Sequence, residues 1–182
     1  MINWPVPRYM ENVWEKLNAD SWRAMEDCVE KGLIRHIGVS NFLPAHLEAL
    51  DKTAVIKPSV TQLEIHPNFQ QRETVDYCRK KGMDIMAWSP LFKGKAVKLP
   101  EIVRLAVQYR KTPAQIILRW DIQNGIMPVV SSTNPERIKS NFGVFDFTIE
   151  EADMHIINAL ETGEHVDVFS YRRQQESLKG TN

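Results

Sequence analysis

The segment GLIRHIGVSNF spans residues 32–42 and holds an apolar run, Ile34 to Val39, that ends in Ser40 and Asn41. A short apolar run bounded by turn residues predicts a strand. Similar runs occur at 59–65, 83–88 and 126–131. None of them alternates strictly between apolar and polar residues, which is typical of strands that helices cover on both faces.

Segments with helical spacing lie between these strands. The first is expected to begin at Asp20 or Ser21 and to stop at Gly32. A late helix is expected to open at Thr148, which forms a capping box with Glu151. The remaining helices are expected at 44–50, 71–81, 100–111, 113–124 and 135–142. Strand followed by helix, without hairpin signals, predicts parallel strands joined by crossover helices in an α/β fold.

Composition narrows the class of protein further. The chain has 182 residues, 43% of them hydrophobic and 25% charged, with 23 basic and 23 acidic side chains. This balance excludes disorder and predicts no broad attraction to nucleic acid or to an anionic membrane. No apolar run approaches the roughly 20 residues of a membrane helix, and the N-terminus lacks the pattern of a secretory signal.

The two cysteines, Cys28 and Cys78, lie in helix-like segments. They predict no disulfide framework and favour a reduced, cytoplasmic location. No linker or low-complexity tract divides the chain, so a single domain is expected over 1–182. Its polar end, about 162–182, is expected to be a loop or tail.

Polar side chains follow each predicted strand, where the parallel strands of an α/β fold collect their ligands. Ser40 and Asn41 follow the first strand, and Gln62, Glu64 and His66 lie in or after the second. The sets after the third and last strands are Trp88, Ser89 and Leu91, and then Ser131, Ser132, Thr133, Asn134, Arg137 and Asn141.

These residue types suit a dinucleotide, although no Gly-x-Gly-x-x-Gly motif is present. Asn and Gln offer a donor and an acceptor together, which matches a carboxamide such as that of nicotinamide. An aromatic residue at a strand end offers a flat face for ring stacking. A Ser/Thr-rich loop entering a helix N-terminus suits phosphate, and Arg137, about one turn into that helix, adds a fork of donors.

Each set also has an ordinary structural explanation. Ser40 and Asn41 can be turn and cap residues, and Gln62 can satisfy the backbone of a neighbouring strand. Trp88 can belong to the core, and residues 131–134 can form an N-cap cluster. The five histidines show neither H-x-x-x-H nor H-E-x-x-H spacing, which argues against a metal site.

Five segments, taken in order, resemble the aldo-keto reductase superfamily over nearly the whole chain. They are GLIRHIGVSNF (32–42), SVTQLEIHP (59–67), MDIMAWSPL (83–91), KTPAQIILRW (111–120) and STNPERIKSNFGVFDF (132–147). MINWPVP at the N-terminus resembles the family's strand-four motif, usually LIHWP. The resemblance implies a (β/α)₈ barrel of TIM type, here incomplete, with Met1–Asn3 as strand four and strands one to three absent.

The resemblance also implies NADPH or NADH as cofactor, bound across the carboxyl ends of the strands. Ser40, Asn41 and Gln62 would bind the nicotinamide carboxamide, and Trp88 would stack on the ring in place of the more usual Tyr. Trp4 matches the aromatic residue beside the substrate carbonyl. The phosphates and the adenosine would be held by Ser89, Leu91, Ser132, Thr133, Arg137 and Asn141.

Two departures from the family pattern affect the expected chemistry. Ser131 stands where NADPH-preferring relatives carry a Lys that pairs with the 2′-phosphate, so the choice between NADPH and NADH stays open. Asn3 stands at the family's catalytic His, and an amide does not titrate near neutrality. The family's proton-donating Tyr, with its Lys and Asp partners, precedes strand four, and these 182 residues hold no matching segment.

The sequence thus predicts an NAD(P)H-dependent reductase of aldehydes and ketones whose 182 residues alone have little or no turnover. The missing general acid typically contributes about 10²–10⁴-fold. Two alternatives stay open: a non-catalytic nucleotide-binding or scaffold protein, and an enzyme assembled with a separate N-terminal fragment. The expected partner is a small carbonyl compound, with no nucleic acid and no membrane. Exposed barrel edges would invite self-association.

Overall fold

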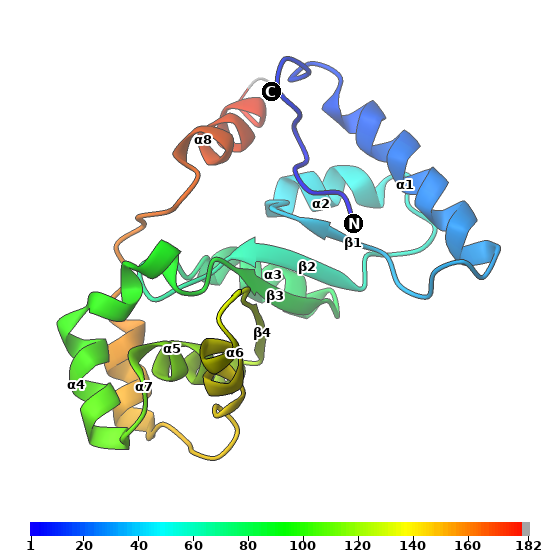
Figure 1. Ribbon diagram of the computed structural model, residues 1–182. Helices are drawn as coiled ribbons and strands as arrows, with labels where there is room; N and C mark the ends of the chain where they lie inside the picture. Colours follow the sequence, from blue (N-terminus) through cyan, green and yellow to red (C-terminus); the bar gives the residue numbers. More distant parts are fainter. Residues whose placement is uncertain (180–182) are drawn as a thin grey trace. The chain divides into compact units, whose positions relative to one another are not determined.

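The computed structural model describes residues 1–179 and divides into two compact units. Of the described residues, the first unit comprises 1–63, 72–85 and 167–179, and the second comprises 64–71 and 86–166. The elements are α1 (Trp14–Glu30), β1 (Gly38–Ser40), α2 (Pro44–Asp51), β2 (Val60–Glu64), α3 (Arg72–Lys80), β3 (Asp84–Trp88), the 3-10 turns η1 (Phe92–Gly94) and η2 (Ala96–Lys98), α4 (Pro100–Tyr109), α5 (Pro113–Gln123), β4 (Ile126–Val129), α6 (Pro135–Phe142), α7 (Glu151–Asn158) and α8 (Val168–Ser177) (Figure 1).

The strands are hydrogen-bonded in the order β1-β2-β3-β4. β1 and β2 pair in parallel, with Ser40 opposite Gln62. Ile2 forms a single parallel bridge with Val39. Its N–H donates to the Gly38 carbonyl at 3.1 Å, and its carbonyl accepts from the Ser40 N–H at 2.7 Å. The α/β class with parallel strands is therefore confirmed, and the strand expected at Met1–Asn3 is one bridge.

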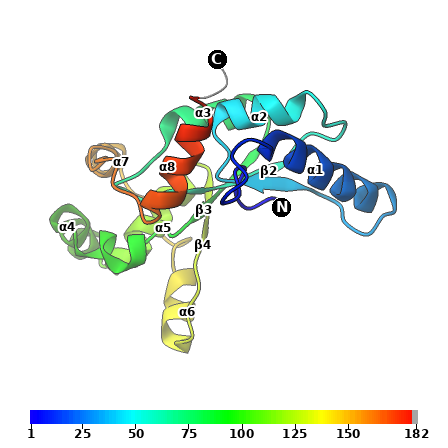
Figure 2. The same ribbon diagram turned by 90° about the horizontal axis from the view of Figure 1, so that it is seen from above.

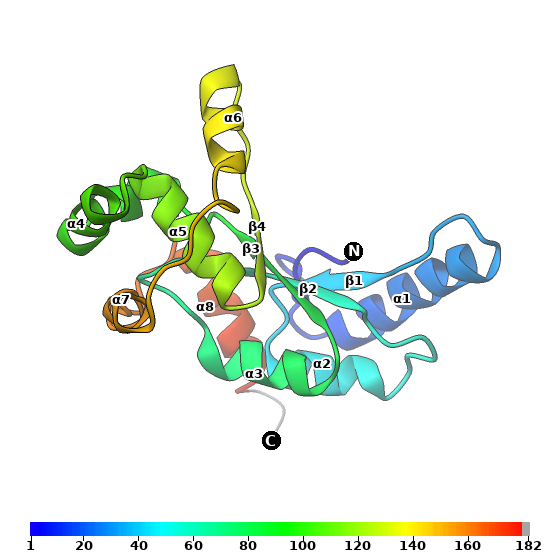
Figure 3. The ribbon, with the colours of Figure 1, turned by 90° about the horizontal axis from the view of Figure 1, so that it is seen from below.

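In the first unit, α1 buries a stripe of residues spaced four apart, which a helix places on one face. The stripe consists of Trp14, Asn18, Trp22 and Glu26. The Trp22 indole N–H donates to the Ile56 carbonyl at 2.9 Å. The Glu26 carboxylate accepts the N–H groups of Val55 and Ile56, both at 2.8 Å. Figures 2 and 3 both show α1 and α2 along the same side of β1 and β2.

In the second unit, α4, α5 and α7 pack around fully buried aliphatic side chains. These are Ile102, Leu105, Ile116, Ile117 and Ile157. The Trp120 indole N–H donates to Asn158 Oδ1 at 2.8 Å and so joins α5 to α7. In contrast, α6 buries none of its residues and projects beyond the end of β4 (Figure 3). Its exposed position leaves it free to line a pocket.

Two expected helix starts are wrong. α1 begins at Trp14, and Asp20 and Ser21 lie inside it as exposed residues, because the buried stripe continues toward the N-terminus. α7 begins at Glu151 without any side-chain cap. Thr148 does not cap it, because its hydroxyl accepts a hydrogen bond from Arg119 at 3.1 Å instead.

The chain after 162 was expected to be a loop or tail, and the structure has the helix α8 over 168–177. The Asp167 carboxylate begins this helix by accepting the N–H of Ser170 at 3.0 Å. Gln174 is buried and accepts the N–H of Val6 at 3.0 Å. Residues 180–182 of the expected tail lie outside the described residues. Within residues 1–179, no helix is long and apolar enough to span a membrane.

His46 is a buried histidine that the first unit holds in its neutral form. Its Nδ1 accepts the N–H of Leu43 at 3.1 Å, so the ring proton is on Nε2, which lies 3.4 Å from the Ser177 hydroxyl. The indole of Trp14 packs edge-on at 5.0 Å between ring centroids. Burial lowers the pKa of His46 from 6.5 to about 4, because desolvation penalises the charged imidazolium.

This shift predicts a loss of stability in mild acid. Between pH 6.5 and about 4, His46 binds a proton in the unfolded chain but not in the folded chain. The free energy of unfolding therefore falls as the pH falls through this window. The full effect of His46 is roughly 3 kcal/mol by pH 4. His46→Asn keeps an acceptor for Leu43 but does not titrate. Urea unfolding of both chains from pH 7.5 to 4 should show the stability advantage of His46 shrinking with acidity. An unchanged difference across the window would contradict the prediction.

Candidate functional site

In the first unit, the end of β1 gathers four of the predicted residues. The Ser40 hydroxyl donates to the Gln62 carbonyl at 2.8 Å, and the Asn41 N–H donates to the same oxygen at 2.9 Å. The Asn41 side-chain amide donates to the Asn3 carbonyl at 3.0 Å and to the Ser40 hydroxyl oxygen at 3.1 Å. Ser40 and Asn41 are buried. The structure therefore brings Asn3, Ser40, Asn41 and Gln62 together and uses several of their polar groups to shape the turn.

The Gln62 side chain differs from its neighbours in this group. It is half-buried, and its amide has no hydrogen-bond partner among residues 1–179. A half-buried amide with both its donor and its acceptor free can pair with a carboxamide. Trp4 is half-buried, whereas the side chain of Asn3 is exposed. Gln62 is thus the residue of this group best able to bind a ligand.

In the second unit, a pocket of about 600 Å³ lies at the end of β3. Six of the predicted residues line it: Ser89, Leu91, Ser131, Ser132, Arg137 and Asn141. Further lining comes from Thr112 to Ala114 at the start of α5 and from Lys93, Gly94 and Val97. The structure therefore brings together most of the residues that the sequence assigned to the phosphate and adenosine end.

The loop from Ser89 to Gly94 forms part of the wall of this pocket. Ser89, Phe92, Lys93 and Gly94 have φ between 49° and 84°, in the left-handed region. Only glycine adopts this region without cost, so three residues here are held in a conformation that needs support from their surroundings. Phe92 supplies such support, because its side chain is buried and its ring stacks on His66 at 4.2 Å between centroids.

The N-terminus of α6 is occupied by its own cap. The Asn134 side-chain oxygen accepts the N–H groups of Glu136 at 2.9 Å and of Arg137 at 3.3 Å. The N-cap explanation is therefore correct for Asn134, and two donors that a phosphate could use are already satisfied. Thr133 is exposed and does not line the pocket, while Trp88 ends β3 as a half-buried residue.

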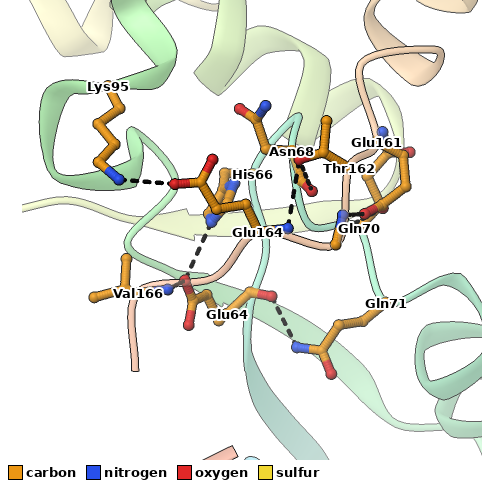
Figure 4. Close-up of polar contacts among 11 residues, drawn as sticks. Glu64, His66, Asn68, Gln70, Gln71, Lys95, Glu161, Thr162, Glu164 and Val166 are labelled. Carbon is orange, nitrogen blue, oxygen red and sulfur yellow. Dashed lines mark hydrogen bonds and ion pairs between the residues drawn. The ribbon is translucent and has the colours of Figure 1, made fainter. Parts of the chain in front are cut away.

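The buried carboxylate of Glu64 joins the end of β2 to a later segment of this unit (Figure 4). It lies 3.1 Å from His66 Nε2 and accepts the N–H of Val166. The Glu64 carbonyl accepts a hydrogen bond from the Gln71 side chain at 2.8 Å. Of the polar residues predicted in or after the second strand, Glu64 and His66 therefore form a structural pair. It closes the end of β2 over a segment much later in the chain.

That segment, residues 161–166, is here called the strap. The N–H groups of Thr162 and Gly163 donate to the Asn68 carbonyl at 3.0 and 2.9 Å. The Glu161 carboxylate accepts the N–H of Gln70 at 2.6 Å. Lys95 pairs with Glu164 at 2.8 Å on the surface (Figure 4). These contacts hold the strap against the loop 66–70.

Sequence reasoning missed Lys93, Val97 and the residues 112–114 as pocket lining. The only signal for Lys93 was its place two residues after Leu91 in the same loop. Within the described chain, no group of three or more His, Cys, Asp or Glu side chains could hold a metal ion.

Comparison with known proteins identifies the family of the chain. The model of the aldo/keto reductase family matches residues 2–162. "Uncharacterized oxidoreductase YtbE" of Bacillus subtilis is 44% identical over 160 residues, which cover 88% of this chain and 54% of the relative. "Glyoxal reductase" of Bacillus subtilis is 44% identical over 147 residues, which cover 81% of this chain and 53% of the relative.

A solved structure of a Gox0644 mutant in complex with NADPH matches with a TM-score of 0.84 and 33% identity. The match covers 91% of this chain and 60% of that structure. The chain belongs to the aldo/keto reductase family, as the five sequence segments indicated. It spans about half the length of these curated relatives.

The strap predicts a large effect of Glu64 on local stability. Glu64→Ala leaves the Val166 N–H and the buried His66 ring without their acceptor, which should cost about 3 kcal/mol. Hydrogen exchange should show faster exchange of the Val166 amide and of the strap. Glu164→Gln is the matched control, because it removes only a surface ion pair with Lys95, for which we expect less than about 1 kcal/mol. Equal effects of both substitutions would refute the central role of Glu64.

Proposed function

We propose that the chain binds a nicotinamide dinucleotide and provides the cofactor-binding part of a carbonyl reductase. The observation that carries the proposal is the pocket of about 600 Å³ that Ser89, Ser132 and Arg137 line together. Hydroxyl groups and a guanidinium are the donors that phosphate groups prefer. The printed name of the relative "Glyoxal reductase" supports a small aldehyde or ketone as substrate. We place this activity in the cytoplasm.

The residues at the end of β1 fit the nicotinamide end of such a cofactor. The free amide of Gln62 would pair with the carboxamide, and the turn at Ser40 and Asn41 would fix the orientation of that amide. Trp88, at the end of β3, would supply a stacking face. When bound, the cofactor supplies a hydride for the carbonyl carbon. The chain's own contribution is to bind the cofactor and to fix which face of the ring is presented.

These 182 residues taken alone are proposed to have little turnover. Asn3 can donate a hydrogen bond but cannot titrate near neutrality. Burial raises the pKa of Tyr109, whose hydroxyl donates to the Asp153 carboxylate at 2.7 Å. Burial likewise raises the pKa of Tyr77. A tyrosine that donates a proton efficiently needs its pKa lowered toward neutrality, so neither suits the task.

The competing proposal is a non-catalytic nucleotide-binding or scaffold protein. Asn3 favours this proposal, because it stands where the family has a titratable histidine, while the residues proposed to bind the cofactor are present. Both proposals require binding of NADPH or NADH, and they differ in whether the family's proton donor joins these residues in a working enzyme. Self-association through exposed strand edges would be a further consequence of an incomplete barrel.

Binding and turnover of the purified chain test the proposal separately. Titration with NADPH and with NADH should quench the tryptophan fluorescence, and Trp88→Phe should remove much of that quenching. Absorbance should show little or no NAD(P)H oxidation with glyoxal or with an aromatic aldehyde. Failure to bind either cofactor would eliminate both proposals. Fast oxidation by chain whose intact mass has been verified would overturn the proposed lack of turnover.

The pocket residue Ser131 predicts how cofactor preference can be changed. Ser131→Lys should tighten NADPH binding about tenfold relative to NADH, because a lysine can form a charge-assisted hydrogen bond with the 2′-phosphate. Met127→Lys is the control: Met127 lies exposed on β4, the strand that precedes Ser131, and outside the pocket lining. Isothermal titration with both cofactors measures the ratio. A ratio that shifts equally in both variants would indicate a general charge effect instead.

A further inference from the structure

The charged residues that line the pocket are all positive. Its lining includes two cations, Lys93 and Arg137, and no carboxylate. The whole chain is balanced, with 23 basic and 23 acidic side chains, so this separation of charge is local. A pocket lined by unopposed cations attracts anions and raises their local concentration.

Neither cation is neutralised by its surroundings. Among residues 1–179, the Lys93 ammonium and the Arg137 guanidinium have no hydrogen bond or ion pair. Two other lysines of this unit are paired: Lys95 with Glu164 at 2.8 Å and Lys111 with Asp146 at 2.7 Å. The lysines at 93 and 95 lie two positions apart, yet only Lys95 has a carboxylate beside it.

The backbone at Lys93 is also unusual. Lys93 has φ 50° and ψ 32°, and its neighbours Phe92 and Gly94 lie in the left-handed region as well. A long side chain in this conformation costs energy that glycine would avoid, and such strain concentrates at ligand-binding positions. The buried ring of Phe92 anchors the turn on one side of Lys93. The loop therefore keeps a lysine in the wall of the pocket at the expense of its own stability.

We infer that Lys93 is a second phosphate-binding cation and acts together with Arg137 on the phosphate groups of the cofactor. The inference rests on the proposed cofactor binding and adds a residue that determines affinity. An ammonium group serves as a point charge for phosphate, whereas a guanidinium forms paired hydrogen bonds, so the two side chains complement each other. Lys93 thereby supplies, from a different loop, positive charge that the pocket lacks at Ser131.

The ordinary alternative is an exposed lysine that only interacts with water. Both Lys93 and Arg137 are exposed without a ligand, and an isolated surface charge contributes little to binding once salt screens it. The alternative predicts that removing the charge at 93 has the same effect as removing it from any nearby exposed lysine. Lys98 is such a residue: it is exposed, it ends η2 and it does not line the pocket.

The test compares Lys93→Gln with Lys98→Gln in the full chain. Both substitutions remove one charge from a long side chain, and thermal unfolding checks that both variants fold. Dissociation constants are measured by isothermal titration for NADPH, NADH and adenosine 2′,5′-bisphosphate at two salt concentrations. We expect Lys93→Gln to weaken NADPH binding about tenfold and to reduce its salt dependence, with Lys98→Gln within about twofold of the parent chain.

Comparison of the three ligands identifies which phosphate Lys93 binds. Equal weakening for NADPH and NADH supports contact with the pyrophosphate. Weakening for NADPH and the bisphosphate, with NADH unchanged, supports contact with the 2′-phosphate. If the parent chain binds cofactor and Lys93→Gln behaves like Lys98→Gln, the inference is overturned and the proposed function stands. If the parent chain binds none of the three ligands, the proposed function itself fails.

Discussion

The backbone enters the left-handed region directly after two strands, and the candidate binding residues depend on these turns. Asn41 follows β1 with φ 61°, and Ser89 follows β3 with φ 54°. Each costs roughly 1–2 kcal/mol relative to ordinary backbone. At Asn41 the side-chain amide offsets this cost by donating to the Asn3 carbonyl and to Ser40. The same polar groups therefore shape the strand end and limit how many donors stay available to a ligand.

The pocket of the second unit depends on a buried chain of contacts. Glu64 holds the His66 ring at 3.1 Å, and that ring stacks on Phe92 at 4.2 Å. Phe92 anchors the strained loop 89–94, which lines the pocket. The strap is held by the same carboxylate through Val166. Because a single buried carboxylate supports both the loop and the strap, disturbance of the strap should also loosen the pocket wall.

Local signals decided how far the sequence could predict the fold. The helix 135–142 was predicted with its exact bounds, because Asn134 and Pro135 mark its start and Gly143 its end. The start of α1 was missed because half of its buried stripe is polar. Nothing in the sequence reveals that Asn18 and Glu26 bind backbone groups outside the helix, 13 and 29 residues away. The polar composition of the C-terminal segment likewise concealed α8, whose buried Gln174 is held by Val6.

The candidate site was predictable by position but not by the state of each side chain. Several residues at strand ends lie close together within each unit, since parallel strands place their carboxyl ends together, whereas Thr133 does not line the pocket. Whether a hydroxyl is already used depends on contacts such as that from Ser40 to the Gln62 carbonyl. Binding and catalysis also make different demands. The proposed cofactor binding relies on unpaired cations in an open pocket, such as Arg137, whereas proton donation needs a hydroxyl with a lowered pKa. Contacts that are equally strong in the ground state and in the transition state do not speed the chemical step. A pocket that suits a cofactor therefore does not by itself make a working reductase.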